Sequence, residues 1–487
     1  MNELAASVAV LGGQDLPVLR QTLEELRKLR KQEDRITGRD VSRVVLLDPM
    51  MTLHVLRYAE SKRTPRQPTD ITTVEHAVMM HGITSFFANF SKLKTIEEVL
   101  AGFPQALQGA LGVISRAYQA SIIAGNLAAA RHDVESDEVI ISALLHEMAE
   151  MLLWICMPEP AIRLQQLMDH SKGIRSASMQ RVLLGYSLTE LQLQLARTWK
   201  LPPLLMSLMD DEHAERPRVL NVSLAAGLAR HTTHGWYDAA IPDDINGVRK
   251  LIGGSIDAAQ KLVKHASIQA ARKWKYFDVR PNAAWIPMEP GPWPDSNDAA
   301  QVAGNKPDAD LMKRSLIVLK TPQSAKKPDP AWQDNGIAGL LYGIVNGAGL
   351  ARAAYGKVNV AKRVVEFNHG LMNSGGLQYP ELQFALGAPH LFARIMERMQ
   401  GLWCNSSTRV KLLPHLPAPL DTQLANMDFF CMSIHDERGL PSAFIYADAG
   451  VASRPLDETR YALFKQLCMA AARQLHGVRV EPPVAVK

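Results

Sequence analysis

The sequence contains few cysteines, and they are not arranged for metal binding or for a disulfide framework. Cys156, Cys404, Cys431 and Cys468 are scattered, with no CxxC pair and no neighbouring histidines at zinc spacing. This absence argues against zinc fingers and against a disulfide-rich secreted scaffold. We therefore expect four reduced, mostly buried thiols in a cytoplasmic protein.

Long apolar runs are also missing. No stretch approaches the roughly 18 uninterrupted apolar residues that a membrane helix requires. The N-terminal segment MNELAASVAVLGGQD has no basic region and only a short apolar stretch, so it does not read as a signal peptide. We expect no membrane partner and a cytoplasmic location.

The chain lacks a strong excess of charge and is poor in aromatic residues. Its net charge is +5, its aromatic fraction is 6%, and its basic residues alternate with acidic ones, as in LEELRKLRKQEDR at 23–35. A nucleic-acid track needs clustered basic residues, commonly with aromatics among them. Nucleic acid is therefore not an expected partner. The nucleophile motif GxSxG is absent, and NSGG at 373–376 lacks the Lys and Ser/Thr of a phosphate-binding loop.

The composition that remains describes a multi-domain globular protein. Hydrophobic residues make up 47% and charged residues 21% of the chain, a composition typical of folded proteins. Its length of 487 residues is greater than that of one ordinary domain. From Leu16 to Ala271 nearly every segment has helical periodicity, including a long apolar helix over 136–156. The pattern predicts an all-α domain, with a C-terminal helical extension, over residues 1–275.

The pattern changes after this domain. Residues 276–330 are rich in Pro and Gly and contain one short helical piece, which predicts a linker. Within 331–487 the periodicity is mixed, with strand-like runs near 351–358, 363–369 and 409–413, a hairpin at 429–450 around DERG, and a last helix over 457–475. These patterns predict an α/β (α+β) domain over residues 331–487.

The segment ALLHEMAEML at 143–152 is the strongest candidate for a site. In the predicted helix over 136–156, Ser142, His146, Glu147 and Glu150 fall on its polar stripe. Either His146 and Glu147 are remnants of a His-Asp metal-ligand pair, or His146 and Glu150 pair at i, i+4 and the stripe is structural. A divalent metal needs three or four protein ligands from several helices, which favours the structural alternative.

The helical half resembles the HDOD family, the catalytically silent relatives of the HD phosphohydrolases. The resemblance rests on five main blocks, of which the Asp48-Pro49 turn and the helix ending at Gly82 are the most specific: LPVL at 16–19, VVLLDPMMTLHVLRYAES at 44–61, ITTVEHAVMMHGI at 71–83, SRAYQASIIAGNLA at 115–128 and SALLHEMAEMLL at 142–153. Two weaker blocks, LPPLLMSLMDDEH at 201–213 and VLNVSLAAGLAR at 219–230, follow in the expected order. The resemblance places Ala120 where the catalytic superfamily has its first histidine ligand and Gly227 near its last aspartate. His146 is kept, and Glu147 stands for an aspartate. The resemblance thus implies no catalytic residues, no metal and no cofactor.

The C-terminal third resembles a GAF-like domain, in GLARAAYGKVNVAKRVVEFNHGL at 349–371 and LQFALGAPHLFARIMERMQG at 382–401. Such domains bind small molecules or cyclic nucleotides, or they dimerise. The two resemblances together imply a non-enzymatic bacterial signal-transduction protein that acts through protein contacts of its HDOD domain, with the GAF-like domain as modulator. A small-molecule or cyclic nucleotide ligand and a homodimer are compatible with this reading.

Two alternatives remain open at this point. The first is a divergent metal-dependent phosphohydrolase or cyclic dinucleotide phosphodiesterase that uses His146, Glu147 and Glu150. The second is a nucleotide-binding regulator in which the same three residues contact a ligand inside the degenerate HD cavity.

Overall fold

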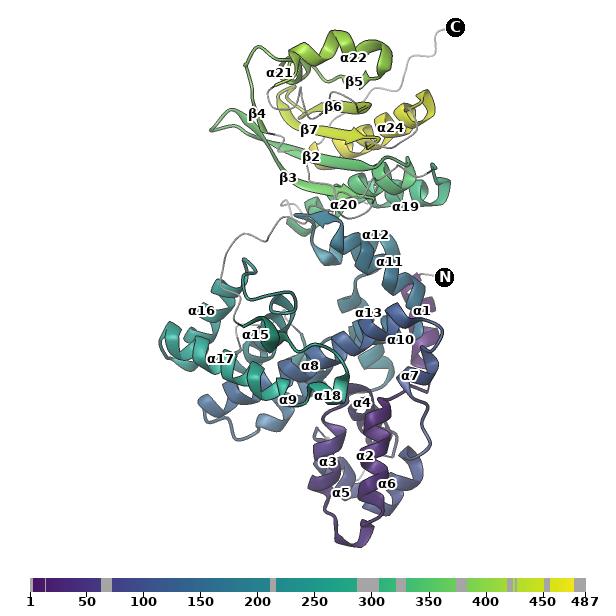
Figure 1. The fold of residues 1–487 in the computed structure, drawn as a ribbon, viewed down its shortest axis with the longest axis vertical. Helices are drawn as coiled ribbons and strands as arrows, with labels where there is room; N and C mark the ends of the chain where they lie inside the picture. The colour runs from purple at the N-terminus through teal and green to yellow at the C-terminus, as the bar shows by residue number, and fades with distance from the viewer. Residues whose placement is uncertain are drawn as a thin grey trace. The chain divides into compact units, whose positions relative to one another are not determined.

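The chain divides into two compact units that do not follow a single cut in the sequence. In this computed structural model the described residues are 3–13, 15–62, 72–210, 216–286, 306–320, 330–373, 383–417, 424, 427–450 and 456–476. The first unit consists of Met1–Ile162 and Leu188–Trp293, and the second of Arg163–Ser187 and Pro294–Lys487. Both are drawn in Figure 1.

The first unit is built from helices, which confirms the predicted helical N-terminal part. Its helices are α1 (Glu3–Gly12), α2 (Arg20–Arg30), α3 (Gly38–Val45), α4 (Pro49–Ser61), α5 (Val74–His81), α6 (Ile83–Phe90), α7 (Ile96–Val99), α8 (Pro104–Ala130), α9 (Ser136–Leu145), α10 (Met148–Cys156), α13 (Leu188–Thr198), α14 (Pro203–Leu208), α15 (Pro217–His231), α16 (Ile241–Ile252), α17 (Ile256–Ala271) and α18 (Trp274–Phe277).

Helix α8 is the long central element of this unit. Pro104 occupies its first turn, where a missing N–H costs nothing. Helices α9, α10, α15 and α17 all pack against it. Small residues allow the close approach: a Cβ at Gly109 would lie 2.6 Å from the Trp154 ring of α10. The chain therefore places α8 and α10 close together, and this contact positions the site described below.

The buried carboxylate of Asp48 joins α4 to α2, and Thr22 extends this network to α18. Asp48 caps α4 by accepting hydrogen bonds from two backbone N–H groups of its first turn, at 2.9 and 3.1 Å. The same side chain accepts from the Leu19 backbone and from the Thr22 hydroxyl at the start of α2, both at 2.8 Å. Thr22 in turn lies 2.8 Å from the hydroxyl of Tyr276 in α18. Asp48 thus has a structural role in the block that carries the family resemblance.

The second unit combines helices with a sheet, in agreement with the α/β (α+β) class predicted for the C-terminal part, and all neighbouring strands of the sheet are antiparallel. Its strands are β1 (Ser171–Lys172), β2 (Arg352–Asn359), β3 (Val364–Met372), β4 (Gln383–Ala385), β5 (Gly401–Cys404), β6 (Phe429–His435) and β7 (Pro441–Asp448). The strand order is β1-β3-β2-β7-β6-β5, and β4 also pairs with β3. Its helices include α12 (Ser176–Leu184), α19 (Ala309–Lys320), α20 (Pro330–Tyr342), α21 (Leu391–Ile395), α22 (Ser406–Leu412) and α24 (Glu458–His476).

Both faces of the sheet are covered. Strand β6 is buried along its whole length. Because successive side chains point to opposite faces of the sheet, they pack into two different hydrophobic cores. Phe430 contacts Tyr461 and Phe464 of α24, which lies against the sheet (Figure 1). Phe429 belongs to the other core, where Phe392 of α21 packs. The hairpin predicted at 429–450 is confirmed by the pairing of β6 with β7, and the predicted last helix is confirmed as α24.

Residues 163–187 leave the helical unit and complete the second one. Helix α11 (Pro158–Asp169) starts in the first unit and ends in the second. Strand β1 then pairs with β3, and the Arg175 Nε atom lies 2.7 Å from the Asp334 carboxylate of α20. The helical periodicity of these residues predicts a place inside the helical domain 1–275. The sequence does not reveal their true place, because pairing with a distant strand leaves no local pattern.

Two element predictions were wrong. The helix predicted over 136–156 is interrupted, because α9 ends at Leu145 and α10 begins at Met148. The strand predicted at 409–413 lies in α22 and the turn after it: the Asn405 side chain accepts from the backbone N–H groups of Ser407 and Thr408, and this local cap overrides the β-like composition. The stretch Ser136–Cys156 is apolar and long enough to cross a membrane, but 78% of its apolar window is buried inside the protein, as in a core helix.

The predicted linker is only partly described. Its residues 287–305 and 321–329 lie outside the described residues, as do residues 374–376 of the NSGG stretch. The short helical piece predicted within it is α19, which packs on α20 and α24 in the second unit.

Gly173 should be sensitive to substitution if residues 163–187 belong to the sheet unit. Its φ is +70°, and an added Cβ would lie 2.0 Å from the Asn368 carbonyl oxygen of β3. We expect Gly173→Ala to destabilise the sheet unit by about 2–4 kcal/mol through backbone strain and overpacking. The measurement is hydrogen exchange at the β2 and β3 amides of the full chain.

Gly439→Ala is the matched control, because Gly439 also has a positive φ of +76° but nothing lies within 4 Å of its added Cβ. It should cost about 1 kcal/mol. Equal effects of the two substitutions would contradict the assignment of residues 163–187 to the sheet unit.

Candidate functional site

Four charged side chains from three helices meet at the predicted site. Arg116 of α8 donates from Nε to Glu147 Oε2 at 2.7 Å and from Nη2 to Glu150 Oε2 at 2.8 Å. Arg230 of α15 donates from Nε to Glu147 Oε1 at 3.0 Å. Both carboxylate oxygens of Glu147 are therefore engaged by guanidinium groups. We call these four residues the Arg–Glu cluster.

The cluster is most buried at its centre. The exposed fraction of the side chain is 8% for Glu147 and 12% for Arg116, but 51% for Arg230. A buried carboxylate is tolerated only when it is paired and hydrogen-bonded. Burial alone would raise the pKa of Glu147, but the charges of Arg116 and Arg230 outweigh it and lower that pKa from 4.5 to about 2. Glu147 is thus held as a carboxylate.

The break between α9 and α10 places the two glutamates. His146 is the C-cap residue of α9 and Glu147 is the N-cap residue of α10, with φ −110° and ψ 26° at Glu147. The single polar stripe that a continuous helix would give is therefore not formed. Glu147 at the N-cap of α10 and Glu150 in its first turn both bind Arg116. The partner observed for Glu150 is Arg116, whereas the sequence suggested His146.

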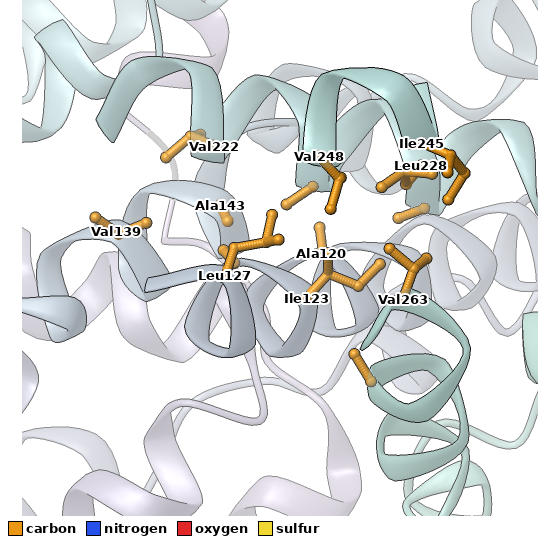
Figure 2. Packing of buried hydrophobic residues seen from close by; sticks show 14 of the residues in the cluster. Ala120, Ile123, Leu127, Val139, Ala143, Val222, Leu228, Ile245, Val248 and Val263 are labelled. Atoms are coloured by element: carbon orange, nitrogen blue, oxygen red, sulfur yellow. The ribbon is translucent and has the colours of Figure 1, made fainter. Parts of the chain in front are cut away.

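The two further positions that the resemblance assigns to metal ligands, Ala120 and Gly227, have no donor atoms in their side chains. Ala120 is 2% exposed and lies in an apolar cluster formed by residues of α8, α9, α14, α15, α16 and α17. Figure 2 shows this packing, with labelled side chains from α8, α9, α15, α16 and α17: Ala120, Ile123, Leu127, Val139, Ala143, Val222, Leu228, Ile245, Val248 and Val263.

Gly227 lies beside a hydrogen-bonded histidine–carboxylate pair. A Cβ at Gly227 would lie 3.8 Å from Asp244 Oδ1 and 3.9 Å from His231 Cε1. His231 Nδ1 is 2.6 Å from Asp244 Oδ2, and this hydrogen bond raises the pKa of His231. Asp244 already has its partner, so this pair links α15 to α16 rather than offering an additional ligand.

The residues present do not fit a divalent metal ion. Such a centre needs at least three converging donors. Ala120 and Gly227 have none to offer, and Glu147 is saturated by two arginines. Within the described ranges, no group of three or more His, Cys, Asp or Glu side chains could hold an ion.

The sequence analysis missed Arg116 and Arg230, although both lie inside segments that carry the family resemblance. Arg116 precedes Ala120 by four residues and Arg230 follows Gly227 by three, so each lies one helical turn from a position that the resemblance assigns to a metal ligand, and on the same helix face. A signal was available, because carboxylates inside an apolar helix require cationic partners. The sequence alone does not say which of the chain's arginines would supply them.

Comparison with known proteins identifies the helical part. The family model of the HDOD domain matches residues 16–215, so these residues form an HDOD domain. The match covers less than half of the chain, and it includes the excursion 163–187. No curated protein matches the chain.

Several solved structures are similar to the chain at low sequence identity. The MmoQ response regulator from Methylococcus capsulatus str. Bath is 17% identical, with a TM-score of 0.41 over 52% of this chain and 99% of that one. A virulence factor from Campylobacter jejuni subsp. jejuni is 17% identical, with a TM-score of 0.38 over 55% and 100%. An HDOD domain protein with unknown function from Geobacter sulfurreducens is 16% identical, with a TM-score of 0.32 over 57% and 98%.

The lowered pKa of Glu147 predicts an acid-sensitive helical unit. A carboxyl whose pKa is lower in the folded state contributes stability above its unfolded pKa, and that contribution is lost as the pH falls. The relevant window therefore runs from pH 4.5 down to about pH 2. Glu147→Gln should lose about 2–4 kcal/mol at neutral pH and show a flatter pH dependence across this window.

Urea unfolding at a series of pH values, followed by far-UV circular dichroism, measures both effects. Glu150→Gln is the matched control: Glu150 is 28% exposed and bonded to one arginine, so its loss should cost about 1 kcal/mol. Identical costs for the two variants, or an unchanged acid limb in Glu147→Gln, would contradict the description of the cluster.

Proposed function

We propose that this chain, whose residues 16–215 form an HDOD domain, is a non-enzymatic bacterial signal-transduction protein that acts through protein contacts of that domain. The observation that carries the proposal is the bonding of the Glu147 carboxylate. Its two carboxylate oxygens are bound by Arg116 and Arg230, while Ala120 and Gly227 supply no donors beside it. A phosphohydrolase of the related catalytic kind uses bound metal to activate water, and these residues do not support such a centre.

We propose further that the second unit is a GAF-like sensor or dimerisation domain. Counted from β2 and leaving out the short β4, its five main strands run in the order second, first, fifth, fourth, third. All of these neighbours are antiparallel. The hairpin of β6 and β7 and the final helix fit the last strands and the last helix of a GAF-like domain. Helix α24 on one face and α21 on the other are also compatible with it.

The course of the chain supplies a route by which the second unit would modulate the first. Helix α10 carries Glu150 and ends at Cys156, and α11 begins at Pro158 and continues into the second unit. The chain returns at Leu188 in α13, where the Gln192 side chain accepts from the Ala149 backbone of α10 at 3.5 Å. A ligand that repacks α11 or α12 would therefore act on both chain segments that adjoin α10.

A complementation experiment separates the contact mechanism from catalysis. In a strain of the native host that lacks the gene, we expect His146→Gln to restore the phenotype as fully as the wild type, provided that circular dichroism shows a folded chain. The purified wild-type chain should not hydrolyse phosphomonoesters or cyclic dinucleotides with magnesium, manganese, iron or zinc. Metal-dependent turnover that His146→Gln abolishes would contradict the proposal.

A direct search for the partner completes this test. Proteins cross-linked to the wild-type chain in cells are purified, and binding is measured with the pure pair. Saturable binding that survives His146→Gln, with cross-links on residues of the first unit, is the expected result. Cross-links confined to the second unit would overturn the assignment of the contact surface to the HDOD domain.

A nucleotide-binding regulator remains the second candidate, because one arginine of the cluster is accessible. Arg230 is 51% exposed, and only its Nε atom is bonded to Glu147. Its guanidinium could exchange that carboxylate for a phosphate. Under the primary proposal, cyclic dinucleotides leave the thermal midpoint of the chain unchanged. A shift that disappears in Arg230→Ala, but persists in Arg249→Ala on neighbouring α16, would favour the second candidate.

A further inference from the structure

We propose that the guanidinium group of Arg116 is the resident cation of this HDOD domain. It occupies a site formed by the carboxylates of Glu147 and Glu150, and it performs the cross-linking that a metal ion performs in a domain with a complete ligand set. The inference goes beyond the proposed function, because it concerns what holds the helices together and does not depend on the identity of any partner.

The site is selective for a planar cation with two donors. Arg116 uses Nε for Glu147 and Nη2 for Glu150, at 2.7 and 2.8 Å. Two N–H groups of one rigid fork thus serve two separate carboxylates. A lysine ammonium lacks this planar fork, although it carries the same charge. The geometry therefore points to a guanidinium site rather than to a general cation site.

The bonds of the cluster connect three helices that are distant in sequence. Arg116 belongs to α8, the two glutamates to α10, and Arg230 to α15. Glu147 receives one guanidinium from each side, through Oε2 from α8 and through Oε1 from α15. Ligands from several helices converge on one metal ion in a metal centre, whereas here cations from two helices converge on one carboxylate.

The charges within the cluster cancel. Arg116 and Arg230 carry two positive charges, and Glu147 and Glu150 carry two negative ones. No net negative charge remains to attract a divalent ion, and such an ion would first have to displace Arg116 from a place where its side chain is 12% exposed. Arg116 lies one turn from Ala120 on α8, and Arg230 lies one turn from Gly227 on α15. The two cations therefore come from the same two helices that would have to supply the missing metal ligands.

Removing the side chain and supplying its head group in solution tests the proposal. Arg116→Ala in the full chain should lower the thermal midpoint of the helical signal by roughly 5–10 °C, because two carboxylates lose their common partner. Guanidinium chloride, added well below denaturing concentrations, should restore part of that loss in a saturable manner. Arg116→Lys should remain below the wild type, because one ammonium does not reproduce the fork.

Two controls make the rescue specific. The wild type should show no gain from guanidinium, and the double variant Arg116→Ala with Glu147→Gln should show none either, because the carboxylate that receives Nε is gone. Absence of any gain in Arg116→Ala, or an equal gain in the double variant, would overturn the proposal.

A measurement on the wild type keeps the proposal testable even if Arg116→Ala does not fold. The wild-type chain is unfolded in urea with a chelator and refolded in metal-free buffer. Recovery of the full circular dichroism signal and of the original midpoint is expected, because the cation is part of the chain. A requirement for added manganese, iron or zinc would overturn the proposal and would leave the partner experiments above unaffected.

Discussion

The pairing of Glu147 with Arg116 and Arg230 is the interaction on which the helical unit depends. Glu147 is 8% exposed, so its charge is stable there only because two guanidinium groups bind both of its oxygens. The pairing connects α8, α10 and α15 through three guanidinium–carboxylate hydrogen bonds.

The apolar packing next to the cluster belongs to the same arrangement. Ala120, Ala143 and Leu228 fill the space among α8, α9 and α15 with aliphatic groups, and Gly109 allows the ring of Trp154 to lie directly against α8. Donor atoms at these positions would need partners that the neighbouring helices do not provide. The small and aliphatic side chains at these positions therefore allow α8, α9 and α15 to pack closely.

The sequence predicted those features that local patterns determine. The helices of the first unit follow from apolar spacing, and the hairpin at β6 and β7 follows from two apolar runs around a turn that contains Gly439. The sequence also singled out Glu147 and Glu150, which the structure brings together at Arg116, whereas the assignment of Ala120 and Gly227 to former ligand positions stays a prediction. It did not reveal Arg116 and Arg230, or the pairing of β1 with β3, because each depends on a contact between residues far apart in the chain. The strand predicted at 409–413 was wrong because a cap at Asn405, a few residues upstream, decides the conformation there.

The central claim is that the cation of this domain is covalently part of the chain. Elemental analysis of the full-length protein, purified from its native host without a tag or chelator, tests this claim most directly. The account predicts manganese, iron, zinc and nickel far below one ion per chain, in a protein that is folded and unaffected by chelation. One tightly held ion per chain, lost on substitution of His146 or Glu147, would contradict it.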